Sequence, residues 1–170
     1  MNENKLSQVL SKQKKQISDP FTKEEMKDDI IQLVGFIVGE EEYAIPILNI
    51  QEIIKPIEYT RVPSVPEYVL GVFNMRGTVI PLIDLANRFS LGKSKMTPHT
   101  RYIVLKGEDG NVGFVIDRLT EAIKINENRI DQPPETLLKE KGMIYGIGKR
   151  DSNILTILKV DALLKRDFWW

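Results

Sequence analysis

The chain has 170 residues, of which 42% are hydrophobic and 28% charged, and its basic and acidic residues balance to a formal net charge of zero. This length and composition are those of one ordinary globular domain. The charge balance argues against nucleic acid or an anionic membrane as the main partner, and the absence of cysteine excludes disulfides, iron–sulfur clusters and cysteine-ligated zinc. Because no apolar run approaches the ~18 residues of a membrane-spanning helix and no signal-peptide core is present, we expect a soluble cytoplasmic protein.

The first 28 residues are polar and carry charges of both signs, including the run KQKKQ. Leu6, Val9 and Leu10 could form one apolar side of a short helix, but an isolated helix of this length is marginal in water. We therefore expect a flexible polar tail over residues 1–28 and a folded domain over residues 29–168. A short arm that docks on a partner is the alternative interpretation of the tail.

The apolar pattern begins near residue 31. Residues 31–38 form an apolar run, residues 39–42 an acidic turn, and Tyr43-Ala44-Ile45 the start of a second strand, which together predict a hairpin. Pro46 suits the first turn of a helix, and isoleucines then follow at helical spacing. We expect a short helix over residues 47–54 that ends at Lys55-Pro56, and a short strand over residues 59–62.

The stretch from residue 69 to residue 87 carries the strongest pattern. Residues 69–73 and 78–83 are apolar and rich in β-branched side chains, which predicts two strands. Asn74 and Gly77 bound the four residues between them, as a type I turn prefers. The hairpin tip therefore carries Arg76, which we expect to point out of the fold because arginine is rarely buried unpaired.

Three further residues of this stretch have positional meaning. Gly71, inside the first strand, indicates a bulge or the close approach of another backbone segment. Pro81 indicates an edge or bulged position in the second strand, because proline has no amide hydrogen to donate. Asp84 can cap a helix that begins at Leu85.

The remainder of the chain continues the β pattern after a polar connector that contains His99. We expect strands over residues 101–106, 112–116, 121–125, 143–147 and 154–158, a helical turn over residues 135–138, and a closing helix over residues 161–165.

The two halves of the chain resemble each other. The segment YAIPILNIQEI from Tyr43 aligns with VGFVIDRLTEA from Val112, which matches Glu52 with Glu121. Gly71 and residues 79–83 similarly match Gly146 and residues 154–158. Two β-rich halves can share such patterns by chance, but a true duplication predicts two small five-stranded barrels, since closure removes exposed sheet edges.

The sequence has almost no pattern that indicates catalysis or the binding of a metal or cofactor. His99 is the only histidine, so a multi-histidine metal site or a histidine relay is impossible. The sequence has no phosphate-binding glycine loop, no nucleophile elbow and no calcium-loop spacing. We therefore expect no catalytic residue, no metal and no cofactor.

Three stretches in order resemble the CheW family of bacterial chemotaxis: GFIVGEEEYAIPILNIQEI, VPSVPEYVLGV and GVFNMRGTVIPLIDL. A looser similarity continues through GFVIDRLTEAI and YGIGKRDSNILTILKVDALL, so the resemblance covers roughly residues 30 to 166. It implies an all-β fold of two five-stranded, SH3-like β-barrel subdomains that exchange strands, with a few short helices.

The resemblance also implies a function. CheW-like proteins are non-enzymatic adaptors that link the cytoplasmic tips of chemoreceptors to the histidine kinase CheA. They pair end to end with its regulatory domain, which has the same fold, in rings beneath the receptor array, and other CheW copies are a further candidate partner in these rings. Neither nucleic acid nor membrane insertion is implied. The residues that match the family's partner-binding surfaces are Gln51, Glu52, Ile53, Asn74, Arg76 and Gly77.

Two surfaces are expected from the resemblance. Candidates for a groove that receives the receptor's helical hairpin are Ile50, Ile53, Val104, Val115 and the turn Met75-Arg76-Gly77. The kinase side is expected around Gly71 and the strands that follow it, up to residue 82. The sequence leaves open which residue belongs to which surface.

Other interpretations of these residues remain. Glu52 could lie on a solvated helix face, and Arg76 could be a solubilising surface arginine. For the whole chain, the main alternative is a small-barrel module that binds nucleic acid or a ligand, and a CheV-like protein would need a receiver domain for which the chain has no room. An enzyme is the weakest alternative, because no acid, base and nucleophile converge.

Overall fold

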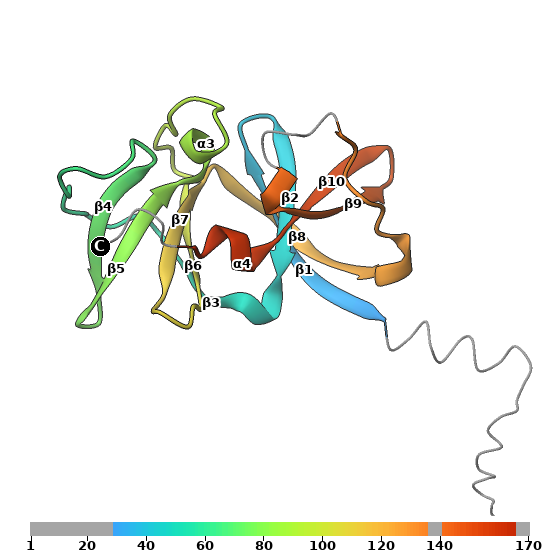
Figure 1. Cartoon of the computed structure of the whole chain (residues 1–170), viewed down its shortest axis with the longest axis horizontal. Coiled ribbons are helices and arrows are strands. Elements are labelled where there is room, and N and C mark those ends of the chain that lie inside the picture. Colours follow the sequence, from blue (N-terminus) through green and yellow to red (C-terminus); the bar gives the residue numbers. More distant parts are fainter. Residues whose placement is uncertain (1–28, 136–140, 166–170) are drawn as a thin grey trace, which may run out of the picture.

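The structure is a computed structural model that describes residues 29–135 and 141–165 (Figure 1). The expected tail over residues 1–28 and nearly all of the expected helical turn over residues 135–138 lie outside the described residues. The described part of the chain is mostly β, with a few short helices, as predicted.

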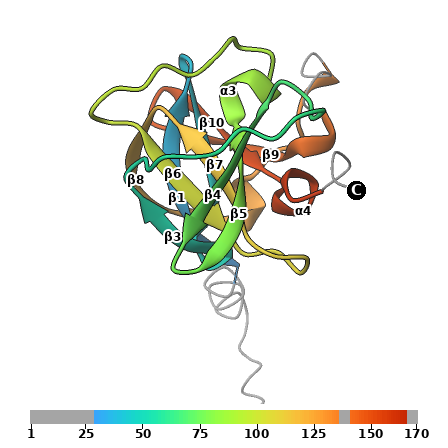
Figure 2. The same ribbon diagram turned by 90° about the vertical axis from the view of Figure 1, so that its left-hand side faces the viewer.

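Within the described residues, ten strands form two five-stranded sheets that lie side by side (Figure 1). Sheet A has the order β8 (Arg118–Asn126), β1 (Ile30–Val38), β2 (Glu41–Pro46), β10 (Asn153–Leu158) and β9 (Ile144–Arg150). Sheet B, which faces the viewer in Figure 2, has the order β3 (Ile50–Ile54), β6 (Arg101–Leu105), β7 (Val112–Ile116), β5 (Thr78–Asp84) and β4 (Val69–Met75). The short helices are η1 (Ile47–Asn49), α3 (Leu85–Arg88), η2 (Glu127–Arg129), η4 (Lys141–Met143) and α4 (Val160–Leu163).

The two sheets repeat one pairing pattern. Each has one parallel pair, β10 with β2 and β5 with β7, and its other pairs are antiparallel. Leu82 lies opposite Gly113 in one sheet and Ile157 opposite Ala44 in the other, which is the register that the internal alignment of the sequence predicts. Each sheet takes two strands from one half of the chain and three from the other, so the duplication and the exchanged strands are confirmed.

The expected closure of the sheets into barrels is wrong. Both sheets stay open, with β8 and β9 as the edges of sheet A and β3 and β4 as the edges of sheet B. Among the described residues, one isolated bridge spans each opening, Thr60 with Val72 and Asp131 with Ile147. Pro56 follows β3 and lacks a donor, and η2 turns the chain after β8, so neither segment continues a ladder. The strand expected over residues 59–62 is reduced to the bridge at Thr60.

The structure shows both features that the sequence suggested as reasons for a glycine at position 71. The β4–β5 register shifts between Val69 and Gly71, which is a bulge, and the φ angle of Gly71 is +151°. A Cβ atom at this position would lie 2.0 Å from the carbonyl oxygen of Thr60, in the segment that bridges to β4. Its counterpart Gly146 is equally constrained, with a Cβ position 2.3 Å from Cγ2 of Ile130.

The helix expected over residues 47–54 is wrong. Its first three residues form η1 after Pro46, but the chain then extends into β3, which pairs with β6. Ile50, Ile53 and Ile54 are β-branched and suit a strand, and their pairing with residues about fifty positions later decides the conformation. The helical spacing of the isoleucines was therefore a local coincidence that long-range pairing overrides.

The central hairpin has the expected strands but a different turn. Met75 pairs with Thr78, and the two residues between them, Arg76 and Gly77, have φ angles of +53° and +85°. Positive φ at both positions is the pattern of a type I′ turn, whose twist matches that of the flanking strands. The predicted type I turn is therefore wrong. Pro81 lies in a strand with two neighbours, but the pairing of β5 with β7 begins only at Leu82.

Asp84 caps α3 as predicted. Its carboxylate accepts a hydrogen bond from the backbone amide of Asn87 and a second one from the amide of Ser94. The same side chain therefore starts the helix and holds the polar connector that follows it.

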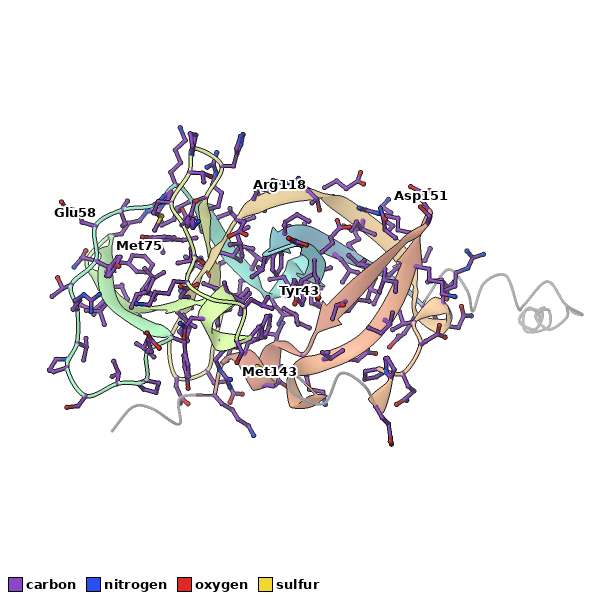
Figure 3. The ribbon with its side chains drawn as sticks, turned by 90° about the horizontal axis from the view of Figure 1, so that it is seen from above. Tyr43, Glu58, Met75, Arg118, Met143 and Asp151 are labelled. Atoms are coloured by element: carbon purple, nitrogen blue, oxygen red, sulfur yellow. The ribbon has the colours of Figure 1, made fainter. Side chains whose placement is uncertain are left out.

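The core has three clusters of buried side chains. The largest lies between the sheets and includes Phe36 and Tyr43 from sheet A and Ile103 and Phe114 from sheet B; Tyr43 is labelled near the middle of Figure 3. The second lies within sheet A and the third within sheet B. The shared cluster makes the two sheets one packed domain.

Candidate partner-binding surface

The structure brings together two of the polar residues that the sequence singled out. Arg76 at the β4–β5 tip donates from Nη1 to Glu52 Oε1 at 2.5 Å and from Nη2 to Glu52 Oε2 at 2.7 Å. Glu52 lies on β3, and β3 and β4 are the opposite edges of sheet B. The bidentate pair therefore joins the two edges of the curled sheet at its surface.

The pair is open to solvent and to a partner. The side chain of Arg76 is 71% exposed and that of Glu52 is 27% exposed. The hydrogen bonds from Arg76 lower the pKa of Glu52, and the same hydrogen bonds raise the pKa of Arg76. Both groups are thus charged near neutral pH, and a competing carboxylate could reach the guanidinium.

Asn74 and Gly77 hold the tip in shape. The side-chain oxygen of Asn74 accepts a hydrogen bond of 2.9 Å from the backbone amide of Gly77. This bond fixes the loop on which Arg76 stands, and both residues are exposed. Met75 is half-buried and packs against the core of sheet B, so the tip is anchored from below.

A cavity of about 850 Å³ lies beside this tip and is lined by apolar side chains together with Glu58, Thr60 and Asn74. Its walls include Ile57, Val79 and Met96, which are exposed, and Val79 is 63% exposed. The Tyr102 hydroxyl donates to the carbonyl oxygen of Ile57 at 3.0 Å and holds one wall in place, and burial raises the pKa of Tyr102 to about 12. The charged tip and this cavity together form one surface, here called the sheet B end.

The structure places the other predicted site residues outside the sheet B end. Val104 and Val115 are fully buried in the core of sheet B, so their side chains offer no surface to a receptor. Gly71 is buried and explained by its contact with Thr60. Ile50 and Ile53 are half-buried and pack against the core between the sheets, while the side chain of Gln51 is exposed.

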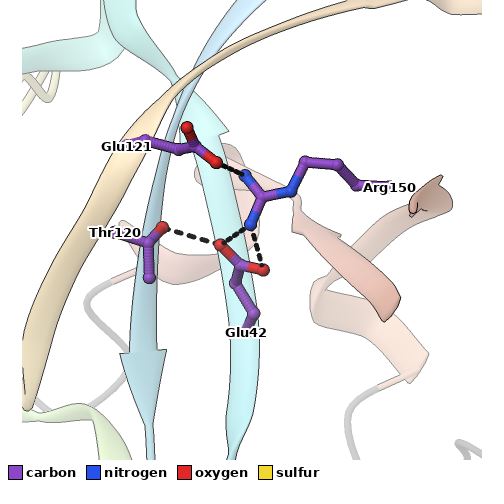
Figure 4. Close-up of polar contacts among 4 residues, drawn as sticks. All are labelled: Glu42, Thr120, Glu121 and Arg150. Carbon is purple, nitrogen blue, oxygen red and sulfur yellow. Dashed lines mark hydrogen bonds and ion pairs between the residues drawn. The ribbon is translucent and has the colours of Figure 1, made fainter. Parts of the chain in front are cut away.

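Sheet A carries a second cluster that the sequence did not single out (Figure 4). Arg150, at the β9–β10 tip, donates from Nη2 to both carboxylate oxygens of Glu42 at 2.8 Å. Its Nη1 lies 2.8 Å from Oε2 of Glu121 as an ion pair without a well-directed hydrogen bond, and Thr120 donates to Glu42 at 2.7 Å. Because Arg150 is on β9 and Glu121 is on β8, this cluster also joins the two edges of its sheet.

The two clusters are pseudo-equivalent but differ in burial. Glu121 is the residue that the internal alignment matches with Glu52. The arginines occupy neighbouring positions of the corresponding hairpin tips, because Arg150 ends β9 and aligns with Met75, whereas Arg76 lies in the turn after β4. The side chain of Arg150 is only 25% exposed and that of Glu42 only 9%. Gly35 makes room for this cluster, since a Cβ there would lie 2.4 Å from Thr120 Oγ1. The only sequence signal for the cluster was the match of Glu52 with Glu121.

An exposed apolar side chain accompanies each hairpin. Ile154 on β10 is 62% exposed and is the alignment counterpart of Val79 on β5. Ile154 lines a cavity of about 640 Å³ together with Ile37, Pro134 and the glutamates of the β1–β2 turn. This surface, here called the sheet A end, corresponds to the sheet B end in its hairpin, whereas its cavity is also lined from the β1–β2 turn.

No helix among residues 29–135 and 141–165 combines the length and the apolar character that crossing a membrane requires.

Comparison with known proteins agrees with this architecture. The model of the CheW-like domain matches residues 32–168. The chain is 51% identical over 165 residues to the chemotaxis protein CheW of Helicobacter pylori. The aligned region covers 97% of this chain and 99% of the relative. It is 34% identical over 137 residues to CheW of Bacillus subtilis, with 80% of this chain and 88% of that protein covered.

A solved structure shows the same fold. The scaffolding protein CheW of Thermoanaerobacter tengcongensis superposes with a TM-score of 0.75 at 32% identity, over 82% of this chain and 90% of that chain. The chain therefore belongs to the CheW-like family, the non-enzymatic scaffolding proteins that couple chemotaxis receptors to the kinase CheA.

Proposed function

We propose that the sheet B end docks the regulatory domain of CheA and that a separate face binds the cytoplasmic tips of the receptors. The observation that carries the first assignment is the exposed Arg76–Glu52 pair beside a cavity whose walls include the exposed apolar residues Ile57, Val79 and Met96. An apolar centre with a charged rim is the usual anatomy of a protein–protein interface, and arginine is a frequent energetic anchor there.

The receptor face is assigned to η1, where the chain crosses from sheet A to sheet B. Leu48 is 84% exposed and its neighbour Ile47 is also exposed. An amphipathic helix needs such apolar contacts to dock. Val104 and Val115, the earlier candidates, are buried, so Ile47 and Leu48 are the better ones.

The duplication supports a further part of the proposal. The two ends carry equivalent hairpins and equivalent exposed apolar residues, with an arginine near each tip, so a partner that itself has two similar ends could alternate with this chain. Such a lattice would place the protein at the inner face of the receptor array and would multiply weak contacts through effective concentration.

Arg76→Glu tests the kinase assignment. The substitution replaces a five-donor cation with an anion and should weaken binding to the CheA regulatory domain at least about tenfold. Binding to a receptor cytoplasmic fragment should change little. Leu48→Glu should show the opposite selectivity, and both variants should keep the wild-type circular dichroism spectrum.

The matched control is Lys93→Glu, which reverses one charge of another exposed ion pair, Lys93 with Glu67. It should leave both affinities unchanged. If Arg76→Glu binds the kinase domain as tightly as Lys93→Glu does, Arg76 is only a surface arginine and the assignment fails. The double variant Arg76→Glu/Glu52→Arg restores the internal pair with inverted polarity, so weak kinase binding by it would show that the partner itself contacts this site.

A further inference from the structure

A second cavity in sheet A adjoins the sheet A end, because Arg150 lines it and pairs with Glu42, which lines the sheet A end. Its volume is about 330 Å³, and it is lined from β8 and β9, the two edge strands of the open sheet. The lining residues are Ile30, Ile123, Lys124, Ile125, Asn126, Arg129, Lys149, Arg150 and Leu155.

The charge of this cavity is one-sided. Four of its lining residues are cationic and none is acidic, in a chain whose net charge is zero. Arg150 is paired with two carboxylates, Glu42 and Glu121, so that cluster carries one net negative charge and contributes no free cation to the cavity. Lys124, Arg129 and Lys149 are exposed, and the described residues offer them no ion-pair partner. Three uncompensated cations around one cavity favour an anionic ligand.

The floor of the cavity is aliphatic. Ile123, Ile125 and Leu155 belong to the buried core of sheet A, and Ile30 at the rim is 47% exposed. An inorganic anion gains nothing from such a floor. Single-stranded nucleic acid would be expected to stack on aromatic side chains, and none lines this cavity. An aliphatic side chain flanked by carboxylates suits both the floor and the rim.

We propose that this cavity binds an acidic peptide segment of a partner protein, with an aliphatic side chain on the floor and carboxylates at Lys124, Arg129 and Lys149. The site shares Arg150 with the sheet A end, but Lys124, Arg129 and Lys149 belong to neither the proposed kinase face nor the proposed receptor face. It is therefore a third interaction surface, and its occupant is recognised by charge complementarity around an apolar contact.

The test measures the fluorescence anisotropy of a labelled peptide, leucine flanked by glutamates on both sides, with the full-length protein. We expect saturable binding that weakens as salt is raised, because the rim charges are exposed. Lys124→Glu and Arg129→Glu should each weaken binding by about fivefold or more. Lys106→Glu, an exposed lysine after β6 in sheet B, makes the same change of net charge and should have no effect.

Four outcomes would overturn the proposal. A peptide with glutamines in place of the glutamates could bind equally well, or Lys106→Glu could weaken binding as much as the pocket variants do. An oligonucleotide could bind the site more tightly than the peptide, which would make it a nucleic-acid site. Finally, binding seen only in the full-length variant Glu24→Gln/Glu25→Gln would assign the cavity to Glu24 and Glu25 of the chain's own N-terminal segment. Circular dichroism of each variant excludes misfolding as the cause.

Discussion

The two arginine clusters show how burial changes the role of one residue type. Arg76 and Arg150 each hold a glutamate across the opening of a sheet. Arg76 is largely exposed, so water and partners compete for its hydrogen bonds and the pair adds little to stability. Arg150 faces a nearly buried Glu42, whose carboxylate would be left without compensation if the arginine were removed. The exposed Arg76 is therefore suited to recognition, and the more buried Arg150 is suited to holding the structure together.

The pKa of Glu52 offers a direct test of the exposed pair. Arg76 lowers this pKa from its ordinary value of 4.5, so the pair stabilises the fold above that pH and is lost as pH falls through the folded-state pKa. A titration of the Glu52 carboxyl by NMR should give a midpoint below 4.5 in the wild type. In Arg76→Ala the midpoint should return toward 4.5, and an unchanged midpoint would mean that the pair does not persist in solution.

At the scale of elements, hairpins were predictable and the openings of the sheets were not. Alternating or continuous apolar runs between turn residues located β1–β2, β4–β5, β6–β7 and β9–β10, since their pairings are local in sequence. The strand β3 was mistaken for a helix because its partner β6 lies about fifty residues away. Likewise, the sequence indicates Arg76 and Glu52 as separate candidates for partner binding. Their contact, between residues 24 positions apart, depends on the curl of sheet B and is not visible in the sequence.

Strand β5 supplies a test of the core. Ile80 faces the core within sheet B and Ile83 faces the core between the sheets, and both are buried. Ile80→Ala and Ile83→Ala should each lower the free energy of unfolding by about 2–5 kcal/mol through lost burial and a cavity. Val79→Ala, at the exposed start of the same strand, should change it by less than ~0.5 kcal/mol. Equal effects at all three positions in denaturant melts would refute this facing of β5.

The Arg150 cluster should matter for stability where the Arg76 pair does not. Arg150→Leu should cost about 2–4 kcal/mol, because Glu42 is left unpaired in a nearly buried position. Replacing Glu42 by leucine as well should recover part of the loss, since an apolar pair needs no compensation. Arg118→Leu removes an exposed arginine from β8 and serves as the control. If Arg150→Leu and Arg118→Leu unfold at the same denaturant concentration, the cluster is not structural.

At the scale of the whole molecule, the duplication gives the protein two similar ends rather than one. The sequence similarity between residues 43–53 and 112–122 indicates this duplication, and the equivalent strand order of the two sheets confirms it. The equivalence extends to the exposed Val79 and Ile154. A molecule with two docking ends can link partners into chains or rings, whereas a molecule with one end can only form a closed pair.

The equivalence of the two ends predicts the stoichiometry of the complex with the CheA regulatory domain. Mixed with the CheA regulatory domain, the wild-type protein should form assemblies larger than one-to-one, as measured by size-exclusion chromatography with light scattering. Val79→Glu places a charge in the apolar part of the sheet B end, and Ile154→Glu does the same at the sheet A end. Each single variant keeps one functional end and should stop at a one-to-one complex. The double variant should elute as separate components, because a buried unpaired charge opposes docking at both ends.

The two single variants also control for each other, because each makes the same chemical change at an equivalent position of the duplicated fold. Leu91→Glu, at an exposed leucine beyond α3, serves as the neutral control and should assemble like the wild type. If Ile154→Glu still forms the larger assemblies while Val79→Glu does not, only the sheet B end docks the kinase domain. The structural duplication would then have left a single working interface, and the lattice would have to be closed by the receptors instead.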